Sequence, residues 1–319
     1  MSFGITVAAV LAAYAVSLPA QSAPVEQGRK LFEDRKYAEA RALLQPLAPR
    51  DAAASYFMGR IALEENAESK AADWFEKAVA LDPRSSLYHV WLGRAYGSQA
   101  QKASKLKQPF LAKKTKSAWE KAIALDPDNL DAREDMIAYY LQAPGFLGGS
   151  KDKARAMAME IRKRNAYRGT VVTANICADS KDVVCVQREL QSLIANYPDS
   201  VAGYTALAAS YANAKQYDKA FEVLDGRLKS RPEEAAILYA LGRTASISGQ
   251  HLNRGERALR AYIESPQKNG PAPANAHYRL GMVLEKKGDK PGARLEYQAA
   301  LRLNPRLEDA KRALAALGA

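Results

Sequence analysis

Two stretches of this chain share one spacing of residues, which constrains the fold more than any other feature. They read YFMGRIALEENAESKAADWFEKAVALDP and YRLGMVLEKKGDKPGARLEYQAALRLNP. In each, an Ala stands twelve positions after the Gly, an aromatic residue four later, a second Ala three after that, and a Pro five beyond. This spacing predicts two amphipathic helices per unit, with small residues where they cross closely and Pro just past the second helix. We therefore predict an all-α fold.

The same register continues through most of the sequence. The small residue of the first helix recurs as Gly28, Gly59, Gly93, Ala208, Gly242 and Gly281. We expect eight helix-turn-helix units near residues 21–51, 52–85, 86–129, 130–166, 167–200, 201–234, 235–273 and 274–306. Residues 307–317 then predict a capping helix, which a soluble array of this kind needs over its last apolar face.

The pattern resembles the tetratricopeptide repeat superfamily. That resemblance implies a right-handed superhelical solenoid whose first helices line a concave groove, with a non-catalytic role in binding other proteins. The segment Ala143 to Gly149, "APGFLGG", and the segment Leu92 to Gly97, "LGRAYG", are similar to turns and helices of uncharacterised exported bacterial members. This second likeness implies a location in the cell envelope.

The first twenty residues form a separate segment. They include ITVAAVLAAYAVSL, a run of about 14 mostly apolar residues, which suits a signal-peptide core and is short of the roughly 20 that a membrane span needs. The start, MSFG, lacks the usual positive charge. We expect a signal peptide over 1–20 with cleavage after Ala20 and a periplasmic protein; an uncleaved anchor in the inner membrane is the alternative.

The formal net charge is +12, and residues 1–20 contribute nothing to it. Such a surplus favours acidic partners, namely anionic lipid, acidic peptide or nucleic acid. Export makes nucleic acid the least accessible of the three. A protein or peptide partner of unknown identity is therefore expected, with an anionic membrane surface as a further candidate.

The sequence offers little for catalysis. Its three histidines are His89 and His277, at a position that the superfamily fills with packed side chains, and His251, in a predicted turn. They form no ligand cluster with the two cysteines, and no nucleophile motif is present. We expect no enzyme activity, no metal and no cofactor.

The glycine-rich segment GFLGGSKD does not fit a phosphate-binding loop. Counting from Gly145, Ser150 stands where the second Gly is required and Asp152 where the hydroxyl is required. We predict instead an enlarged turn within the fourth unit, with Ser150 capping the following helix. Lys151 and Lys153 at that helix start leave a weaker anion-binding hypothesis open.

The two cysteines, Cys177 and Cys185, lie on either side of the predicted turn of the fifth unit. In an exported protein a disulfide that joins the two helices is expected. Two unlinked buried thiols are the alternative.

Arginines recur directly after the small residue of the first helix, a position that faces the groove in the resembled superfamily. We predict a partner-binding groove in which consecutive arginines grip carboxylates, with tyrosines supplying flat contact area. Its residues are Arg29, Tyr56, Arg60, Arg94, Asn175, Tyr239, Arg243 and Tyr278. In the alternative, the arginines are solvated or paired with a neighbouring acid such as Glu64.

The third unit carries an insertion, residues 101–117, that is rich in lysine and has no acidic residue. Its lysines are Lys102, Lys105, Lys107, Lys113, Lys114 and Lys116, and Leu106, Phe110 and Leu111 lie among them. This composition suits an anionic membrane surface or a polyanion, although lysine-rich helix extensions are also found simply solvated. The principal hypothesis is thus a peptide-binding scaffold of the bacterial envelope, and the alternative is a peripheral membrane or polyanion-binding adaptor.

Overall fold

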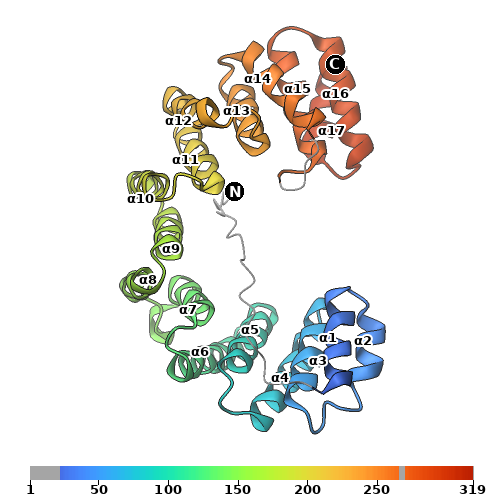
Figure 1. Cartoon of the computed structure of the whole chain (residues 1–319), viewed down its shortest axis with the longest axis vertical. Coiled ribbons are helices and arrows are strands. Elements are labelled where there is room, and N and C mark those ends of the chain that lie inside the picture. Colours follow the sequence, from blue (N-terminus) through green and yellow to red (C-terminus); the bar gives the residue numbers. More distant parts are fainter. Residues whose placement is uncertain (1–21, 266–269, 319) are drawn as a thin grey trace. The chain divides into compact units, whose positions relative to one another are not determined.

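The computed structural model describes residues 22–265 and 270–318, so the expected signal peptide lies outside the described residues. Within those ranges the regular elements are seventeen α-helices and one short 3₁₀ helix, with no strand (Figure 1). The all-α helical-repeat prediction is confirmed. The chain divides into two compact units between Val172 and Thr173, which lie within helix α9.

Helices of the N-terminal unit are α1 (Ala23–Glu33), α2 (Tyr37–Leu44), α3 (Ala52–Glu64), α4 (Glu68–Leu81), α5 (Ser86–Lys102), α6 (Gln108–Leu125), α7 (Leu130–Gln142), the 3₁₀ helix η1 (Gly145–Leu147) and α8 (Lys151–Arg164). Helix α9 (Ala166–Asp179) spans the division. Helices of the C-terminal unit are α10 (Val183–Asn196), α11 (Val201–Asn213), α12 (Tyr217–Ser230), α13 (Ala235–Ser248), α14 (Leu252–Glu264), α15 (Pro273–Lys286), α16 (Lys290–Leu303) and α17 (Glu308–Ala316). Two consecutive helices fall in each expected unit range, except that α9 and α15 each begin one residue before their ranges, 167–200 and 274–306, and α17 lies within 307–317.

Side chains cap several of the helices at their first turn. Asp51 accepts a hydrogen bond from the Ala54 amide at the start of α3, and Asn129 accepts one from the Ala132 amide at the start of α7. Each cap satisfies a backbone donor that the helix leaves free, which is worth about 1 kcal/mol. Ser150 caps α8 in the same way, as predicted.

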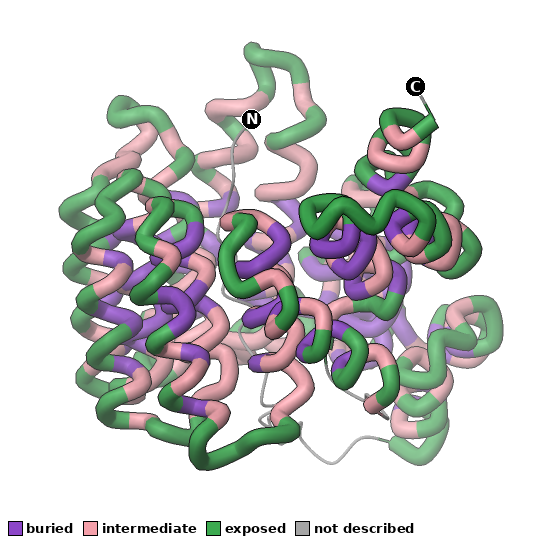
Figure 2. The backbone as a smooth tube through the Cα atoms, turned by 90° about the horizontal axis from the view of Figure 1, so that it is seen from above, coloured by how far each residue is buried: buried purple, intermediate pink, exposed green. Residues whose placement is uncertain are grey.

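The two helices of a unit pack where the small residues allow it. A Cβ atom built at Gly59 would lie 2.6 Å from Cε1 of Phe75, and one at Gly281 would lie 2.4 Å from Cε1 of Tyr297. Both rings are fully buried. The predicted close crossing is therefore real in these two units, and buried and exposed segments alternate along the helices (Figure 2).

The glycine-rich segment is the enlarged turn that the sequence predicts. Gly148 ends η1 with a φ of +93°, a conformation that glycine adopts at little cost. A Cβ at Gly149 would lie 1.7 Å from the Ala143 carbonyl oxygen, so that residue must also be small. The turn is held by the Tyr139 hydroxyl, which donates to the Leu147 carbonyl at 2.8 Å.

Cys177 on α9 and Cys185 on α10 form a disulfide, with Cα atoms 5.8 Å apart. We expect the double variant Cys177→Ser, Cys185→Ser to lose about 2 to 3 kcal/mol of unfolding free energy, because the bridge limits the unfolded chain. Urea unfolding with and without reductant measures this loss. Reductant should not affect the double variant, and two free thiols in the unfolded, unreduced protein would contradict the bridge.

Candidate functional site

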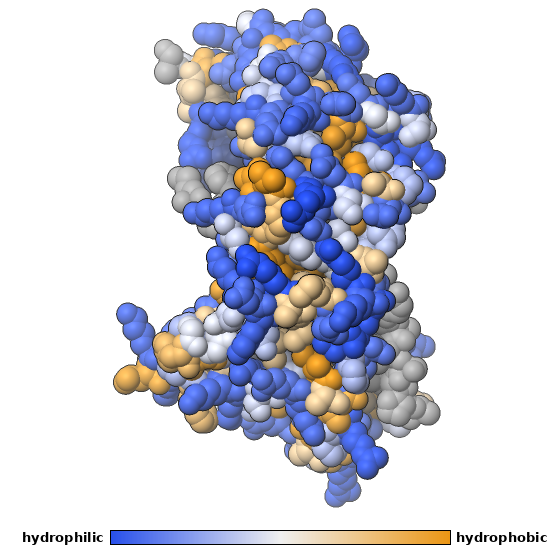
Figure 3. Space-filling view, turned by 90° about the vertical axis from the view of Figure 1, so that its left-hand side faces the viewer, coloured by the Kyte–Doolittle hydropathy of each residue, from blue (hydrophilic) through white to orange (hydrophobic). Residues whose placement is uncertain are grey.

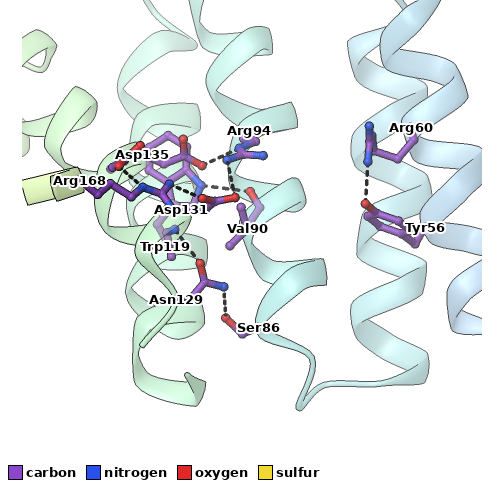
Figure 4. Close-up of polar contacts among 12 residues, drawn as sticks. Tyr56, Arg60, Ser86, Val90, Arg94, Trp119, Asn129, Asp131, Asp135 and Arg168 are labelled. Atoms are coloured by element: carbon purple, nitrogen blue, oxygen red, sulfur yellow. Dashed lines mark hydrogen bonds and ion pairs between the residues drawn. The ribbon is translucent and has the colours of Figure 1, made fainter. Parts of the chain in front are cut away.

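In the N-terminal compact unit, the first helices of successive repeats carry a row of charged side chains (Figure 4). Arg60 lies on α3, Arg94 on α5, Asp131 and Asp135 on α7, and Arg168 on α9. We call these five residues the charged row. Hydrogen bonds between neighbouring helices fix this arrangement: the Trp119 indole donates to the Val90 carbonyl at 3.1 Å, and the Asn129 amide donates to the Ser86 hydroxyl at 2.9 Å.

Arg60 is held by aromatic rings. Its guanidinium carbon lies 3.8 Å from the centroid of the Trp91 ring and 5.0 Å from that of Phe32. Nη1 donates to the Tyr56 hydroxyl at 2.7 Å. In residues 22–265 and 270–318 no carboxylate pairs with Arg60. Its positive charge is thus oriented by cation–π contacts but not neutralised, and most of its five N–H donors remain available.

Arg94 differs from Arg60 although both contact the same ring. Its guanidinium carbon lies 4.7 Å from the Trp91 centroid, and Nε donates to Oδ2 of Asp135 at 2.6 Å. Nη2 lies 3.9 Å from Oδ2 of Asp131. The charge of Arg94 is therefore balanced by the next unit.

The acids of α7 form a network with cations on both sides. Burial raises the pKa of Asp135 to about 6, although Arg94 acts in the opposite direction. Arg168 donates to both Asp131 and Glu134. Burial lowers the pKa of Arg168, but these two acids raise it by more, so this arginine stays charged. The network leaves Arg60 as the end of the row that lacks a counter-charge.

In the expected arginine ladder, Arg29 and Arg94 have acid partners in the structure, whereas Arg60 has none among the described residues. Arg29 pairs with Glu26, one Nη2–Oε1 distance being 2.5 Å, and also with Glu33. Both acids lie on the same helical face as Arg29, at spacings that favour pairing. Arg94 pairs with Asp135. The acids that pair with Arg29 and Arg94 therefore differ from Glu64, the partner considered from the sequence.

Tyr56 was expected to offer flat contact area to a partner, but its ring is buried. It is 5% exposed, because its ring packs against Phe57, Tyr88 and Trp91. Its hydroxyl supports Arg60 instead. Trp91 was not among the predicted groove residues, yet it is half-buried and both guanidiniums lie over its ring. Its position three residues before Arg94 could have indicated this contact.

The remaining groove candidates lie on other helices. Arg243 on α13 has no acid paired with it in the described ranges; burial lowers its pKa, and the charge of Arg279 on α15 lowers it further. Tyr239 and Tyr278 are half-buried and pack against Tyr262 and Tyr297. Oδ1 of Asn175 on α9 is buried and accepts no hydrogen bond from the described part of the chain. These residues belong to the C-terminal unit, whereas the charged row belongs to the N-terminal unit.

The six lysines of the insertion fall into two sets. Lys102 pairs with Glu68, Lys114 lies 3.5 Å from Glu76, and Lys116 lies 3.4 Å from Glu120. The other three have no ion pair with any described residue: Lys105, Lys107 and Lys113.

The histidines occupy structural positions. His89 is buried, with Nε2 3.2 Å from the Pro83 carbonyl, and Nδ1 of His277 lies 2.6 Å from Glu296. His251 packs edge-on against Phe221. In the described ranges no three potential ligands gather as a metal site would require. Among the described helices, none combines the length and apolar character needed to cross a membrane.

Paired helices with close Gly–aromatic crossings define a helical-repeat protein. The family description "Tetratricopeptide repeat" matches residues 25–86 and again residues 274–307. These two segments therefore match tetratricopeptide repeats, and proteins of that superfamily typically bind proteins or peptides.

Known proteins are similar to this chain in fold and, more distantly, in sequence. A tetratricopeptide repeat protein from Parabacteroides merdae ATCC 43184 is 13% identical, with a TM-score of 0.51 over 83% of this chain and 98% of that one. A thermophilic one from Thermus thermophilus is 18% identical, with a TM-score of 0.47 over 59% and 96%. Cellulose synthase operon protein C of Xanthomonas axonopodis pv. citri is 27% identical over 241 residues, 70% of this chain. That match spans 15% of the relative's length.

Proposed function

We propose that this protein is a non-catalytic scaffold that binds an acidic segment of another protein, with Arg60 and Trp91 as the anchor. The observation that carries the proposal is the Arg60 guanidinium, which lies 3.8 Å from the Trp91 ring and has no acid beside it in the described part of the chain. A carboxylate can take two of its N–H donors in one plane. The half-buried indole would supply apolar contact next to that carboxylate.

The rest of the charged row sets the chemistry of the partner. Arg94 and Arg168 already pair with the acids of α7. A ligand that placed carboxylates along the whole row would meet Asp131 and Asp135 and be repelled. The arrangement therefore favours a segment with one acidic residue at Arg60 and polar or basic groups toward α7.

Two other features of the chain support a location in the cell envelope. The apolar run in residues 1–20 has the length of a signal-peptide core, and a disulfide suits an oxidising compartment. We place the scaffold in the periplasm on this basis. Mass analysis of the N-terminus of the protein from cells tests it, since export with cleavage gives a chain that begins at Gln21.

Selection from a random peptide library tests the binding hypothesis. The wild-type protein should enrich peptides that contain Asp or Glu, and Arg60→Glu should lose that preference. Arg84→Glu is the matched control: Arg84 is exposed in the turn between α4 and α5 and has no ion pair with a described residue. If the control loses the preference as fully as Arg60→Glu does, general charge is responsible and the assignment to Arg60 is wrong.

Titration of one selected peptide gives the size of the effect. Arg60→Glu should weaken binding by about 30-fold or more, because the peptide acid then faces a like charge. Arg60→Lys should give an intermediate loss, since lysine keeps the charge but not the planar donors or the stacking on Trp91. Equal binding by wild type and Arg60→Glu would refute the proposal.

A further inference from the structure

Two elements that are far apart in sequence lie side by side in the N-terminal unit: helix α6 and the enlarged turn between α7 and α8. Lys113 and Lys116 of α6 and Phe146 and Leu147 of the turn line one open hollow of about 460 Å³. Lys116 Nζ lies 3.5 Å from where a Cβ of Gly148 would be.

Large apolar side chains protrude from the α5–α6 connection, from the start of α6 and from the enlarged turn. Leu106 is 93% exposed, Phe146 81% and Phe110 62%. Most of the face shown in Figure 3 is hydrophilic, with apolar side chains in separate patches. Leaving a phenylalanine in water forgoes most of the stabilisation that its burial gives. The two exposed phenylalanines of the described surface lie on these neighbouring elements, Phe110 on α6 and Phe146 in the turn, which points to an apolar environment for them in a bound state.

Free cations surround these apolar groups. Lys105, Lys107 and Lys113 have no ion pair with a described residue, whereas the other three lysines of the insertion are paired with Glu68, Glu76 and Glu120. Lys105 and Lys107 flank Leu106, and Lys113 follows Phe110 by one helical turn and shares the hollow with Phe146. We call Leu106, Phe110, Phe146 and these three free lysines the basic apolar edge.

We propose that the basic apolar edge docks the protein on the surface of an anionic lipid bilayer. Isolated apolar tips between lysines can enter the boundary between headgroups and acyl chains while the ammonium groups stay among lipid phosphates. A protein partner would instead require a continuous apolar patch, and here lysines separate the three apolar side chains. The proposal is independent of peptide binding at Arg60.

Vesicle flotation of the full chain tests this docking. Vesicles of phosphatidylcholine with phosphatidylglycerol should bind the wild type much more tightly than phosphatidylcholine alone. The triple variant Lys105→Glu, Lys107→Glu, Lys113→Glu should bind on the order of a hundredfold more weakly, from about fivefold per lysine. Wild type and variants share residues 1–20, so any contribution of that segment to vesicle binding is the same in each and cancels in the comparison.

Two matched controls separate the edge from general effects. Lys70→Glu, Lys229→Glu, Lys290→Glu makes the same change in net charge at exposed lysines that lack ion pairs with described residues. Leu106→Ser, Phe146→Ser should weaken binding, whereas Val184→Ser, Leu295→Ser, at side chains 75% and 65% exposed, should not. Arg60→Glu should also leave vesicle binding within a fewfold of wild type, which distinguishes failure here from failure of the peptide hypothesis.

Hydrogen exchange then locates the contact. Anionic vesicles should protect backbone amides in residues 103–112 and 145–149 of the wild type. Three results would overturn the proposal: equal binding to neutral vesicles, equal losses in the edge variants and their controls, or no protection in these two loops. The edge would be a protein interface if its substitutions abolished binding of an acidic protein and left vesicle binding intact.

Discussion

Replacing Phe75 by alanine is expected to lower the unfolding free energy by about 3 to 5 kcal/mol, a large part of the stability of a typical domain. Phe75 is fully buried on α4, and its ring centroid lies 6.0 Å from that of Tyr56 and 6.1 Å from that of Trp91. Its removal leaves a cavity where Gly59 allows α3 to approach. Urea unfolding followed by circular dichroism measures the loss.

A second phenylalanine supplies the control for this experiment. Phe110 is 62% exposed, so Phe110→Ala should change the unfolding free energy by no more than about 0.5 kcal/mol. Hydrogen exchange should also show faster opening of α3, α4 and α5 in Phe75→Ala. Similar losses in both variants would mean that the ring of Phe75 does not support the core as described.

The Asp135 carboxyl group is expected to titrate with a midpoint near pH 6, and the unfolding free energy should change with pH in that range. Burial raises its pKa from an ordinary value of 3.8 to about 6, so the folded protein holds this proton more tightly than the unfolded chain. The stability from this group is full below about pH 3.8 and is lost as the pH rises through about 6. The loss is on the order of 3 kcal/mol. Carboxyl carbon NMR gives the midpoint directly.

Substitutions separate the causes of that shift. Arg94→Met should move the midpoint of Asp135 above 6, because the charge of Arg94 favours the carboxylate. Asp135→Asn should reduce the fall in stability between pH 4 and 7. Arg155→Met removes an exposed arginine whose one acid partner among the described residues is Asp152, and it should leave the Asp135 curve unchanged. A midpoint near 4 in the wild type would disprove the effect of burial.

Contacts within a repeat could be predicted from the sequence, and contacts between repeats could not. The spacing of Gly59 and Phe75 predicts a close crossing of two adjacent helices, and the structure shows that crossing. The pairing of Arg29 with Glu26 and Glu33 was also readable, since three- and four-residue spacings place the acids beside it. The Arg94–Asp135 pair joins residues 41 positions apart, and nothing in the periodicity specifies which side chains of neighbouring repeats meet.

The basic apolar edge likewise could be predicted only in part from the sequence. Composition identified the lysine insertion, and the glycine-rich segment was correctly assigned to a turn. The adjacency of α6 and this turn depends on how α6 and α7 pack, so Phe146 could not be grouped with Lys113 from the sequence. Likewise, the pairing of Lys102 with Glu68 needs the structure, because the two lie 34 positions apart.

The position of Trp91 links recognition to mechanical strength. In an array whose units touch mainly their neighbours, opening can begin at any junction, and the weakest one sets the resistance of the whole. Trp91 of the third unit packs against Tyr56 and Phe75 of the second and lies beneath Arg60. A ligand that orders Arg60 over the indole ties these two units together. A pull along the chain would then have to release the ligand before it could part them.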